Sequence, residues 1–379
     1  MKRRIKVLHP TSAWGGGHVQ TCINLIKGMQ RAGADTHLHI IRSNVDMSDV
    51  PYSPTVPTLL ARLGLRLLER ARRARTEQRF LSALDEGEIA CLWPTVSITT
   101  YREISRRGNP IVMEGINTRM ASARRILDAV YENAGRAPAH KISDARIAEE
   151  EEMLSLATHF FAPNPGVDAA LIEPDSAFRG LAMKTSYGAW MPSAAPPDRT
   201  KLQNEVVTVI AVGMICLRKN THGLLRAWRQ LNPSGAKLVL CGAVDPEITQ
   251  LCEAELAMQS VEVRGHVSDM NAVYRTADVF VMPSFEEGGP QVTYEAAVHA
   301  VPVIASPMGA GRMQDHEGAV LGIDPYDVTD MAAKIEMLIK DAELRRHYGA
   351  RAYELAPLFD WNAVGRERYS ALQHAFSEL

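Results

Sequence analysis

Two glutamates in the C-terminal half of the chain stand in a setting suited to a hydroxyl-rich ligand. Glu287 follows an apolar run and precedes Gly288 and Gly289. Glu295 comes eight positions later, and Pro290 between them suits the first position of a helix, where its missing N–H costs nothing. Free N–H groups at a helix start bind oxygen-rich ligands. Because carboxylates accept strong hydrogen bonds from hydroxyls, the segment predicts one ligand held from a loop and a helix.

The surrounding pattern resembles the signature of the retaining glycosyltransferases of family 4, which have the GT-B fold. Their mark is two glutamates separated by seven residues, after a Pro-Ser strand end and before a small-residue helix and a Pro-Val strand. Glu287 and Glu295 match this spacing between Pro283-Ser284 and Pro302-Val303. The resemblance implies that Glu287 binds the donor hexose and Glu295 the nucleotide ribose. It also places the donor beside Gly288, Gly289, Gln291 and Thr293. An ordinary strand–loop–helix with two surface glutamates is the alternative.

A basic segment upstream, residues 209–220, resembles the phosphate-binding strand and loop of the same family. A leaving diphosphate gains negative charge in the transition state, and a nearby cation stabilises it. Lys219 matches the family's lysine, whereas Met214 stands where an arginine is usual. Arg218 is the candidate to compensate. The alternative is an exposed basic pair before a helix.

Two further sites, one valine and one run of three glycines, follow from the resemblance or from local chemistry. The backbone beside Val267 is expected to meet the nucleobase. Gly15, Gly16 and Gly17 follow a strand and open a helix, so their backbone could approach a phosphate or a sugar closely. The resemblance implies that this loop faces the diphosphate and the acceptor. A tight strand–helix turn uses the same glycines.

The end of an apolar run at residues 110–114 departs from the family pattern. Many members have a histidine there that contacts the donor sugar, and this chain has Glu114, with Asn117 close behind. Either Glu114 takes a changed role in substrate binding, or it is solvated at a strand end.

The elements that must position these residues alternate between strand and helix. Short apolar runs with amphipathic segments between them predict parallel sheets, and a Pro- and Ala-rich stretch after residue 190 predicts a linker. We expect an α/β protein with two doubly wound, Rossmann-like domains facing a cleft, as in GT-B. The first, expected on the acceptor side, spans residues 1–195, and the second, expected to bind the nucleotide sugar, spans residues 205–360. Residues 361–379 are expected to cross back to the first domain.

Composition narrows the functional classes. A formal net charge of -2 gives no general attraction to nucleic acid, and no apolar run is long enough to span a membrane. The start of the chain lacks the features of a signal peptide. Five scattered cysteines indicate reduced thiols and a cytoplasmic location. Residues 59–80 form a basic amphipathic segment, which predicts either contact with the inner face of the membrane or a solvated crossover helix.

The family resemblance implies an enzyme that transfers a hexosyl group, with retention, from a UDP- or GDP-sugar to a glycan, lipid-linked or small-molecule acceptor. Glu287 and Lys219 are the predicted catalytic residues. No cofactor and no metal are expected, because no carboxylate cluster for one appears. Two alternatives remain open: a protein that binds the nucleotide sugar without transfer, and a related sugar epimerase, hydrolase or phosphorylase.

Overall fold

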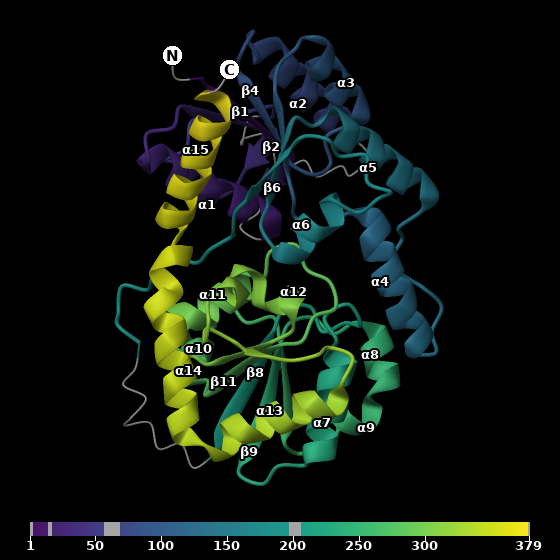
Figure 1. Ribbon diagram of the computed structural model, residues 1–379, viewed down its shortest axis with the longest axis vertical. Coiled ribbons are helices and arrows are strands. Elements are labelled where there is room, and N and C mark those ends of the chain that lie inside the picture. Colours follow the sequence, from purple (N-terminus) through teal and green to yellow (C-terminus); the bar gives the residue numbers. More distant parts are fainter. Residues whose placement is uncertain (1–2, 14–16, 57–68, 197–205, 378–379) are drawn as a thin grey trace.

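The computed structural model describes residues 3–13, 17–56, 69–196 and 206–377, which form two α/β lobes stacked end to end (Figure 1). The first lobe has a parallel sheet of order β3-β2-β1-β4-β5-β6-β7, and the second has one of order β10-β9-β8-β11-β12-β13. Parallel strands need helical crossovers that cover both faces, which explains the nearly continuous apolar runs. The predicted fold class is therefore confirmed.

The first lobe begins at the N-terminus. Its strands are β1 (Ile5–Ala13), β2 (Thr36–Ser43), β3 (Tyr52–Pro54), β4 (Ile89–Leu92), β5 (Ile111–Glu114), β6 (His159–Ala162) and β7 (Leu181–Lys184). Its helices are α1 (Gly17–Arg31), α2 (Glu69–Ala83), α3 (Ile98–Arg106), α4 (Met120–Asn133), α5 (Asp144–Leu156) and α6 (Pro165–Leu171).

The second lobe repeats the plan. Its strands are β8 (Val207–Val212), β9 (Ala236–Cys241), β10 (Val261–Gly265), β11 (Val279–Met282), β12 (Val303–Ala305) and β13 (Leu321–Gly322). Its helices are α7 (Thr221–Leu231), α8 (Pro246–Leu251), α9 (Glu253–Leu256), α10 (Met270–Thr276), α11 (Gln291–Val298), α12 (Pro307–Ala310), α13 (Val328–Lys340) and α14 (Ala342–Leu355). The short 3₁₀ helices η3 (Gly311–Asp315) and η4 (Ala356–Phe359) and the last helix, α15 (Trp361–Ser377), complete the chain.

One local expectation needs correction, and another is covered only in part by the described residues. Pro290 is the N-cap of α11 rather than its first helical residue. The basic segment 59–80 enters the described part of the chain only from Glu69, where α2 begins; residues 59–68 lie outside the described residues.

The order of the strands identifies where ligands should bind. Strand order reverses between β1 and β4 in the first sheet and between β8 and β11 in the second. In open α/β sheets, ligands bind at the carboxyl ends of strands on either side of such a reversal. Lys219 follows β8 and Glu287 follows β11, so both predicted catalytic residues lie at this point of the second sheet.

Arg312, on η3 of the second lobe, connects the two lobes at the ends of β6 and β7. Its guanidinium donates to the carbonyl oxygens of Thr185 at 2.9 Å and Ala162 at 2.8 Å, and it forms an ion pair with Asp168 at 2.7 Å. Because Arg312 is almost fully buried, these partners replace the water that its charge loses. The sequence analysis did not single out this residue.

The C-terminal helix α15 lies against α1 of the first lobe, and the two ends of the chain lie together (Figure 1). The contact is close because glycines face each other across it. A Cβ atom on Gly28 would lie 2.1 Å from the carbonyl oxygen of Trp361, and one on Gly365 would lie 2.3 Å from the carbonyl carbon of Gly28. Only residues without a Cβ atom permit this approach of the backbones.

A side chain at this contact should therefore destabilise the protein. We expect Gly28→Ala to lower the free energy of unfolding by about 2 kcal/mol, which lowers the midpoint of thermal unfolding by about 4–8 °C. Gly322→Ala is the matched control, because a Cβ atom there meets nothing within 4 Å. Calorimetry measures both midpoints, and equal midpoints would show that α1 and α15 do not need the close contact.

Candidate active site

The candidate site is built from two turns of the second lobe. The turn after β8 carries Arg218 and Lys219, and the loop after β11 carries Glu286 and Glu287. The N–H of Phe285 donates to the carbonyl oxygen of Arg218 at 3.0 Å, which holds the turn and the loop together. Two cations and two carboxylates thus gather at the predicted edge of the sheet.

Lys219 and Glu287 form the central contact of this cluster. The Lys219 ammonium donates to Glu287 Oε1 at 2.6 Å, and Ser284 Oγ donates to the same oxygen at 3.0 Å. Arg218 lies 3.6 Å from the other oxygen. Burial alone would raise the pKa of Glu287, but Lys219 and Arg218 outweigh it and the pKa is lowered. Glu287 is therefore charged at neutral pH, with its cations already in place.

Glu286 is a residue that the sequence analysis missed. Its side chain is 2% exposed, and it accepts the backbone N–H of Thr118 at 2.9 Å and a bond from Arg218 at 3.2 Å. Thr118 belongs to the segment after β5, so Glu286 joins the two lobes. The sequence carries no signal for this role, because its partner lies 168 positions away.

Gly288 and Gly289 lie where the loop meets the first lobe. A Cβ atom on Gly288 would lie 1.9 Å from the carbonyl oxygen of Ile116, and one on Gly289 would lie 2.2 Å from the ring of Tyr187. Gln291, at the start of α11, donates to Thr21 of α1 at 2.6 Å. The glycines are thus required for contact between the lobes, whatever their role toward a donor.

Glu295 belongs to a separate cluster on α11. It accepts a bond from the Tyr274 hydroxyl at 2.9 Å, and the Tyr274 ring stacks on His299. Burial raises the pKa of Glu295, and the bond from Tyr274 offsets only part of this effect. Among the described residues, no ion pair joins Glu295 to a cation, so its carboxylate keeps capacity for further hydrogen bonds.

The remaining predicted site residues differ in how far they are buried and in whether the structure describes them. Thr293 is fully buried and donates to the carbonyl oxygen of Gly309 at 2.7 Å, so its hydroxyl is used within the fold. Val267 is partly buried and packs against an apolar cluster of the second lobe, and Asn117 is exposed. Met214 is 55% exposed, so an apolar side chain occupies the surface where the family has a cation. Of the glycine loop, Gly17 is described and has φ of +61°, whereas Gly15 and Gly16 lie outside the described residues.

Glu114 is not solvated, and that interpretation is wrong. It is 2% exposed, its Oε2 accepts a bond from Arg368 of α15 at 2.6 Å, and its Oε1 accepts one from the Tyr187 hydroxyl at 3.1 Å. Arg368 also lies over the ring of Phe161. One oxygen of Glu114 thus holds the C-terminal helix onto the end of β5, and the other binds Tyr187, which follows β7.

Comparisons with known proteins agree with this geometry. Two parallel, doubly wound lobes with a cation-and-carboxylate site at the strand ends define the class of GT-B proteins. Residues 206–341 match the family described as Glycosyl transferases group 1. The second lobe is therefore a glycosyl transferases group 1 domain, and the predicted family resemblance is confirmed.

Relatives of known sequence align over part of the chain. The D-inositol 3-phosphate glycosyltransferase of Corynebacterium glutamicum is 33% identical over 248 residues, covering 60% of this chain and 56% of that protein. The sulfoquinovosyl transferase of Arabidopsis thaliana is 27% identical over 216 residues, covering 55% of this chain and 39% of that protein. The matches thus span about half or less of these relatives' lengths.

Solved structures align over nearly the whole chain at low identity. The sucrose-phosphate synthase of Thermosynechococcus elongatus superimposes with a TM-score of 0.74 at 18% identity, covering 100% of both chains. Anabaena HepE, solved in complex with UDP and glucose, superimposes with a TM-score of 0.69 at 15% identity, covering 98% of this chain and 99% of that one. At such identities the likeness establishes the fold alone.

The Lys219–Glu287 pair makes a testable prediction about pH. The lowered pKa of Glu287 stabilises the fold above the pKa of the unfolded carboxyl, and this stabilisation is lost as the pH falls through the lowered pKa. Lys219→Ala removes the nearest cation, so burial raises the pKa and favours the protonated carboxyl. The variant should lose about 3 kcal/mol near neutral pH, and less in acid.

The midpoint of thermal unfolding, measured from about pH 7 down to about pH 4, checks this expectation. The difference in unfolding midpoint between the wild type and Lys219→Ala should become smaller as the pH falls. Lys340→Ala is the control, since its partner Glu336 lies on the surface of α13. A difference that is constant with pH would show that Glu287 does not depend on Lys219.

Proposed function

We propose that this protein is a retaining glycosyltransferase that moves a hexosyl group from a UDP- or GDP-sugar onto a glycan, lipid-linked or small-molecule acceptor. One observation carries the proposal: the partly buried Lys219–Glu287 pair lies at the strand-order reversal of a glycosyl transferases group 1 domain, against the first lobe. A cation for a diphosphate and a carboxylate for sugar hydroxyls thus stand side by side, as a nucleotide sugar requires.

Known proteins of the same fold support a nucleotide-sugar donor. The structure of Anabaena HepE contains UDP and glucose, and that of an Escherichia coli trehalose-6-phosphate protein contains UDP-2-fluoro glucose. Because their identity to this chain is low, the likeness establishes the fold alone. The nature of the donor is therefore part of the proposal.

The proposed mechanism divides the roles between the two turns. Lys219 and Arg218 stabilise the charge that grows on the leaving diphosphate, while Glu287 orients the hexose through its hydroxyls. Glu295 binds the ribose. Glu287 is engaged by Lys219 and Ser284, so it suits orientation better than attack, and transfer on one face of the sugar accounts for retention. The proposal includes no metal ion and no cofactor.

Binding of a nucleotide sugar without transfer is the second candidate. Met214 places an exposed apolar side chain where the family has an arginine, so one cation that would stabilise the diphosphate is missing. Arg218 must then supply the charge while it remains bonded to Glu286. Product analysis with labelled UDP- and GDP-sugars distinguishes the two candidates, because a binding protein retains affinity and forms no product. The same product analysis identifies an epimerase, hydrolase or phosphorylase.

Replacing the two glutamates should separate chemistry from binding. We expect Glu287→Gln to reduce transfer about 100-fold, because the charged acceptor for the hexose hydroxyls is lost. Glu295→Ala should weaken the binding of UDP or GDP about tenfold, the loss of one hydrogen bond to a carboxylate. Calorimetry with each nucleotide measures the second effect.

Glu336→Gln, on the exposed face of α13, is the control and should change neither quantity. If Glu295→Ala bound every tested nucleotide as tightly as wild type does, the proposed donor site would be wrong.

We further propose a cytoplasmic protein that contacts the membrane through α2. No described helix is long and apolar enough to cross a membrane, so such contact would be peripheral. The five cysteines are free and buried, which supports a reducing location. Arg70 and Arg75 of α2 are exposed while Phe80 packs into the first lobe, so the helix both covers the sheet and presents cations.

Vesicle binding tests this contact. We expect the protein to sediment with vesicles that contain anionic lipid, and the double variant Arg70→Glu/Arg75→Glu to lose most of this binding, because each basic residue near the surface contributes about 1 kcal/mol. Arg346→Glu/Arg351→Glu on α14 is the matched control. Equal sedimentation of both double variants would restrict α2 to its structural role.

A further inference from the structure

A cavity of about 570 Å³ lies in the first lobe at the carboxyl ends of β4 and β5. We call it the β4–β5 cavity; its lining includes His18, Thr95, Met113, Ile116, Glu150 and Met153. The segment 115–118 forms one wall of the cavity. It also contacts the loop after β11 (residues 283–290), which we call the donor loop, through Thr118 to Glu286 and Ile116 to Gly288. The cavity therefore adjoins the proposed donor site directly.

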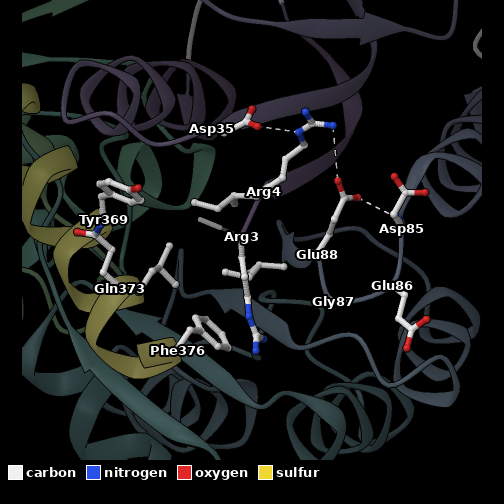
Figure 2. Close-up of a pocket in the computed structure, with 13 residues that line it drawn as sticks. Arg3, Arg4, Asp35, Asp85, Glu86, Gly87, Glu88, Tyr369, Gln373 and Phe376 are labelled. Carbon is white, nitrogen blue, oxygen red and sulfur yellow. Dashed lines mark hydrogen bonds and ion pairs between the residues drawn. The ribbon is translucent and has the colours of Figure 1, made fainter. Parts of the chain in front are cut away.

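Position distinguishes this cavity from a second one in the same lobe. The second cavity, of about 980 Å³, is lined by the starts of β1 and β4, at the opposite edge of the sheet (Figure 2). There Arg4 lies between Asp35 and Glu88, at 2.8 and 3.8 Å, so its charge is already neutralised. Ligands of open α/β sheets bind at the carboxyl ends of strands, which favours the β4–β5 cavity.

Part of the lining of the β4–β5 cavity is apolar and adaptable. Met113, Ile116, Met120 and Met153 are each only partly buried and line it together. When an apolar group displaces water from partly buried apolar side chains, the free energy of binding becomes more favourable. Methionine has three rotatable bonds and fits irregular partners. This apolar part of the lining is therefore suited to a hydrocarbon or aromatic group.

The lining also includes a carboxyl group with bonding capacity left. Glu150 accepts the N–H of Met120, its one hydrogen bond within the described parts of the chain. Burial raises the pKa of Glu150 to about 7. A carboxyl group in this state can both donate a hydrogen bond to a ligand and accept one.

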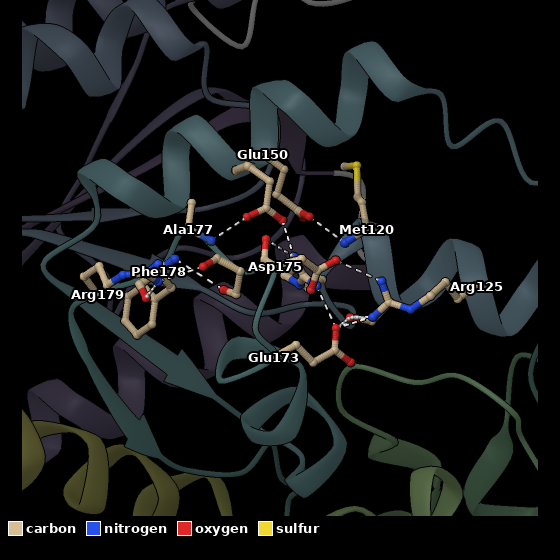
Figure 3. A network of polar contacts seen from close by, with 12 residues as sticks. Met120, Arg125, Glu150, Glu173, Asp175, Ala177, Phe178 and Arg179 are labelled. Atoms are coloured by element: carbon tan, nitrogen blue, oxygen red, sulfur yellow. Dashed lines mark hydrogen bonds and ion pairs between the residues drawn. The ribbon is translucent and has the colours of Figure 1, made fainter.

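The acidic neighbours of Glu150 are satisfied by protein groups. Arg119, whose side chain is 1% exposed, forms ion pairs with Glu151 and Glu173 at 2.7 Å and with Asp175. Glu151 also accepts the N–H of Ala177 at 2.7 Å. Figure 3 shows this network beside Glu150. It holds the wall of the cavity in place and leaves Glu150 for a ligand.

Backbone strain beside the cavity also indicates a ligand-binding site. Thr95, directly after β4, is exposed and has φ of +80°, a conformation that is rare for a β-branched residue. Such strain costs about 1–3 kcal/mol and clusters at ligand-binding sites. The stacked pair His9 and His18 lies nearby, and the Nδ1 of His18 is bonded to His9 at 2.9 Å, so its Nε2 is left for another partner.

We propose that the β4–β5 cavity binds the acceptor, and that the acceptor joins an apolar alkyl or aromatic group to a hydroxyl-bearing head. The apolar group lies against Met113 and Met153, and the head lies between Glu150 and the segment 115–118, toward the donor loop. This inference rests on the proposed function and names the class of acceptor for the same site.

Binding of glucosides that differ only in the aglycone tests the proposal. Calorimetry of the full chain, without donor, compares methyl, n-octyl and phenyl β-glucosides below the micelle concentration of the octyl compound. We expect the octyl or the phenyl glucoside to bind at least about tenfold more tightly than the methyl glucoside, because it buries apolar area. A preference for octyl indicates a hydrocarbon chain, and a preference for phenyl an aromatic group.

Variants assign this preference to the cavity. Met153→Trp should fill the apolar part of the cavity and abolish the preference, whereas Met337→Trp, at an exposed position of α13, should leave it unchanged. Glu150→Gln should weaken all the glucosides that bind by a similar factor, since it acts on the head. Circular dichroism and thermal unfolding confirm that each variant is folded, and Met153→Phe replaces Met153→Trp if the latter is not.

Two results would overturn the proposal: no aglycone preference, including no binding of any glucoside, or a preference that both Met153 variants leave intact. Nucleotide binding is measured separately with UDP and GDP. If nucleotides bind and the aglycone has no effect, the acceptor proposal alone fails. If the aglycone effect is present and no nucleotide binds, the proposed donor site fails instead.

Discussion

The fold depends most on one close contact, in which the loop after β11 meets the segment after β5 without room for a side chain. Gly288 faces the carbonyl oxygen of Ile116, and Glu286 accepts the N–H of Thr118. At Gly288 the contact joins two backbone groups, which have no flexible end that could adjust, so it is either made fully or lost. It sets how far the second lobe stands from the first, and therefore which groups of the first lobe can reach a ligand bound beside Glu287.

Electrostatics at the contact explain why charged side chains can be buried there. Burying a charge is costly unless an opposite charge and hydrogen bonds replace the lost water. Lys219 and Arg218 balance Glu286 and Glu287, so the cluster is close to neutral as a whole. Such a cluster contributes little net stability, but it keeps cations positioned before a ligand arrives. The diphosphate of the proposed donor would meet groups that need no reorganisation, which is the condition for strong electrostatic stabilisation.

Much of the architecture could be predicted from the chain itself. Apolar runs such as that of β11 predicted strands, and the spacing of Glu287 and Glu295 identified the family. The acidic residue at the end of β5 shows where such prediction stops. Glu114 could be read as exposed or as substrate-binding, because a local pattern does not contain its partner. Arg368, 254 positions away on α15, shows that Glu114 holds the C-terminal helix.

The sequence alone determined the class of fold, the strand ends that carry Lys219 and Glu287, and the family of the second lobe. These follow from periodicity and short spacings, which act within one or two neighbouring elements. Tertiary structure alone decided the role of Glu286, the connection made by Arg312 and the position of the β4–β5 cavity. Each of these depends on groups that are distant in the chain and meet only after both sheets have formed. No local propensity encodes such a meeting, because it is set by how the two lobes pack.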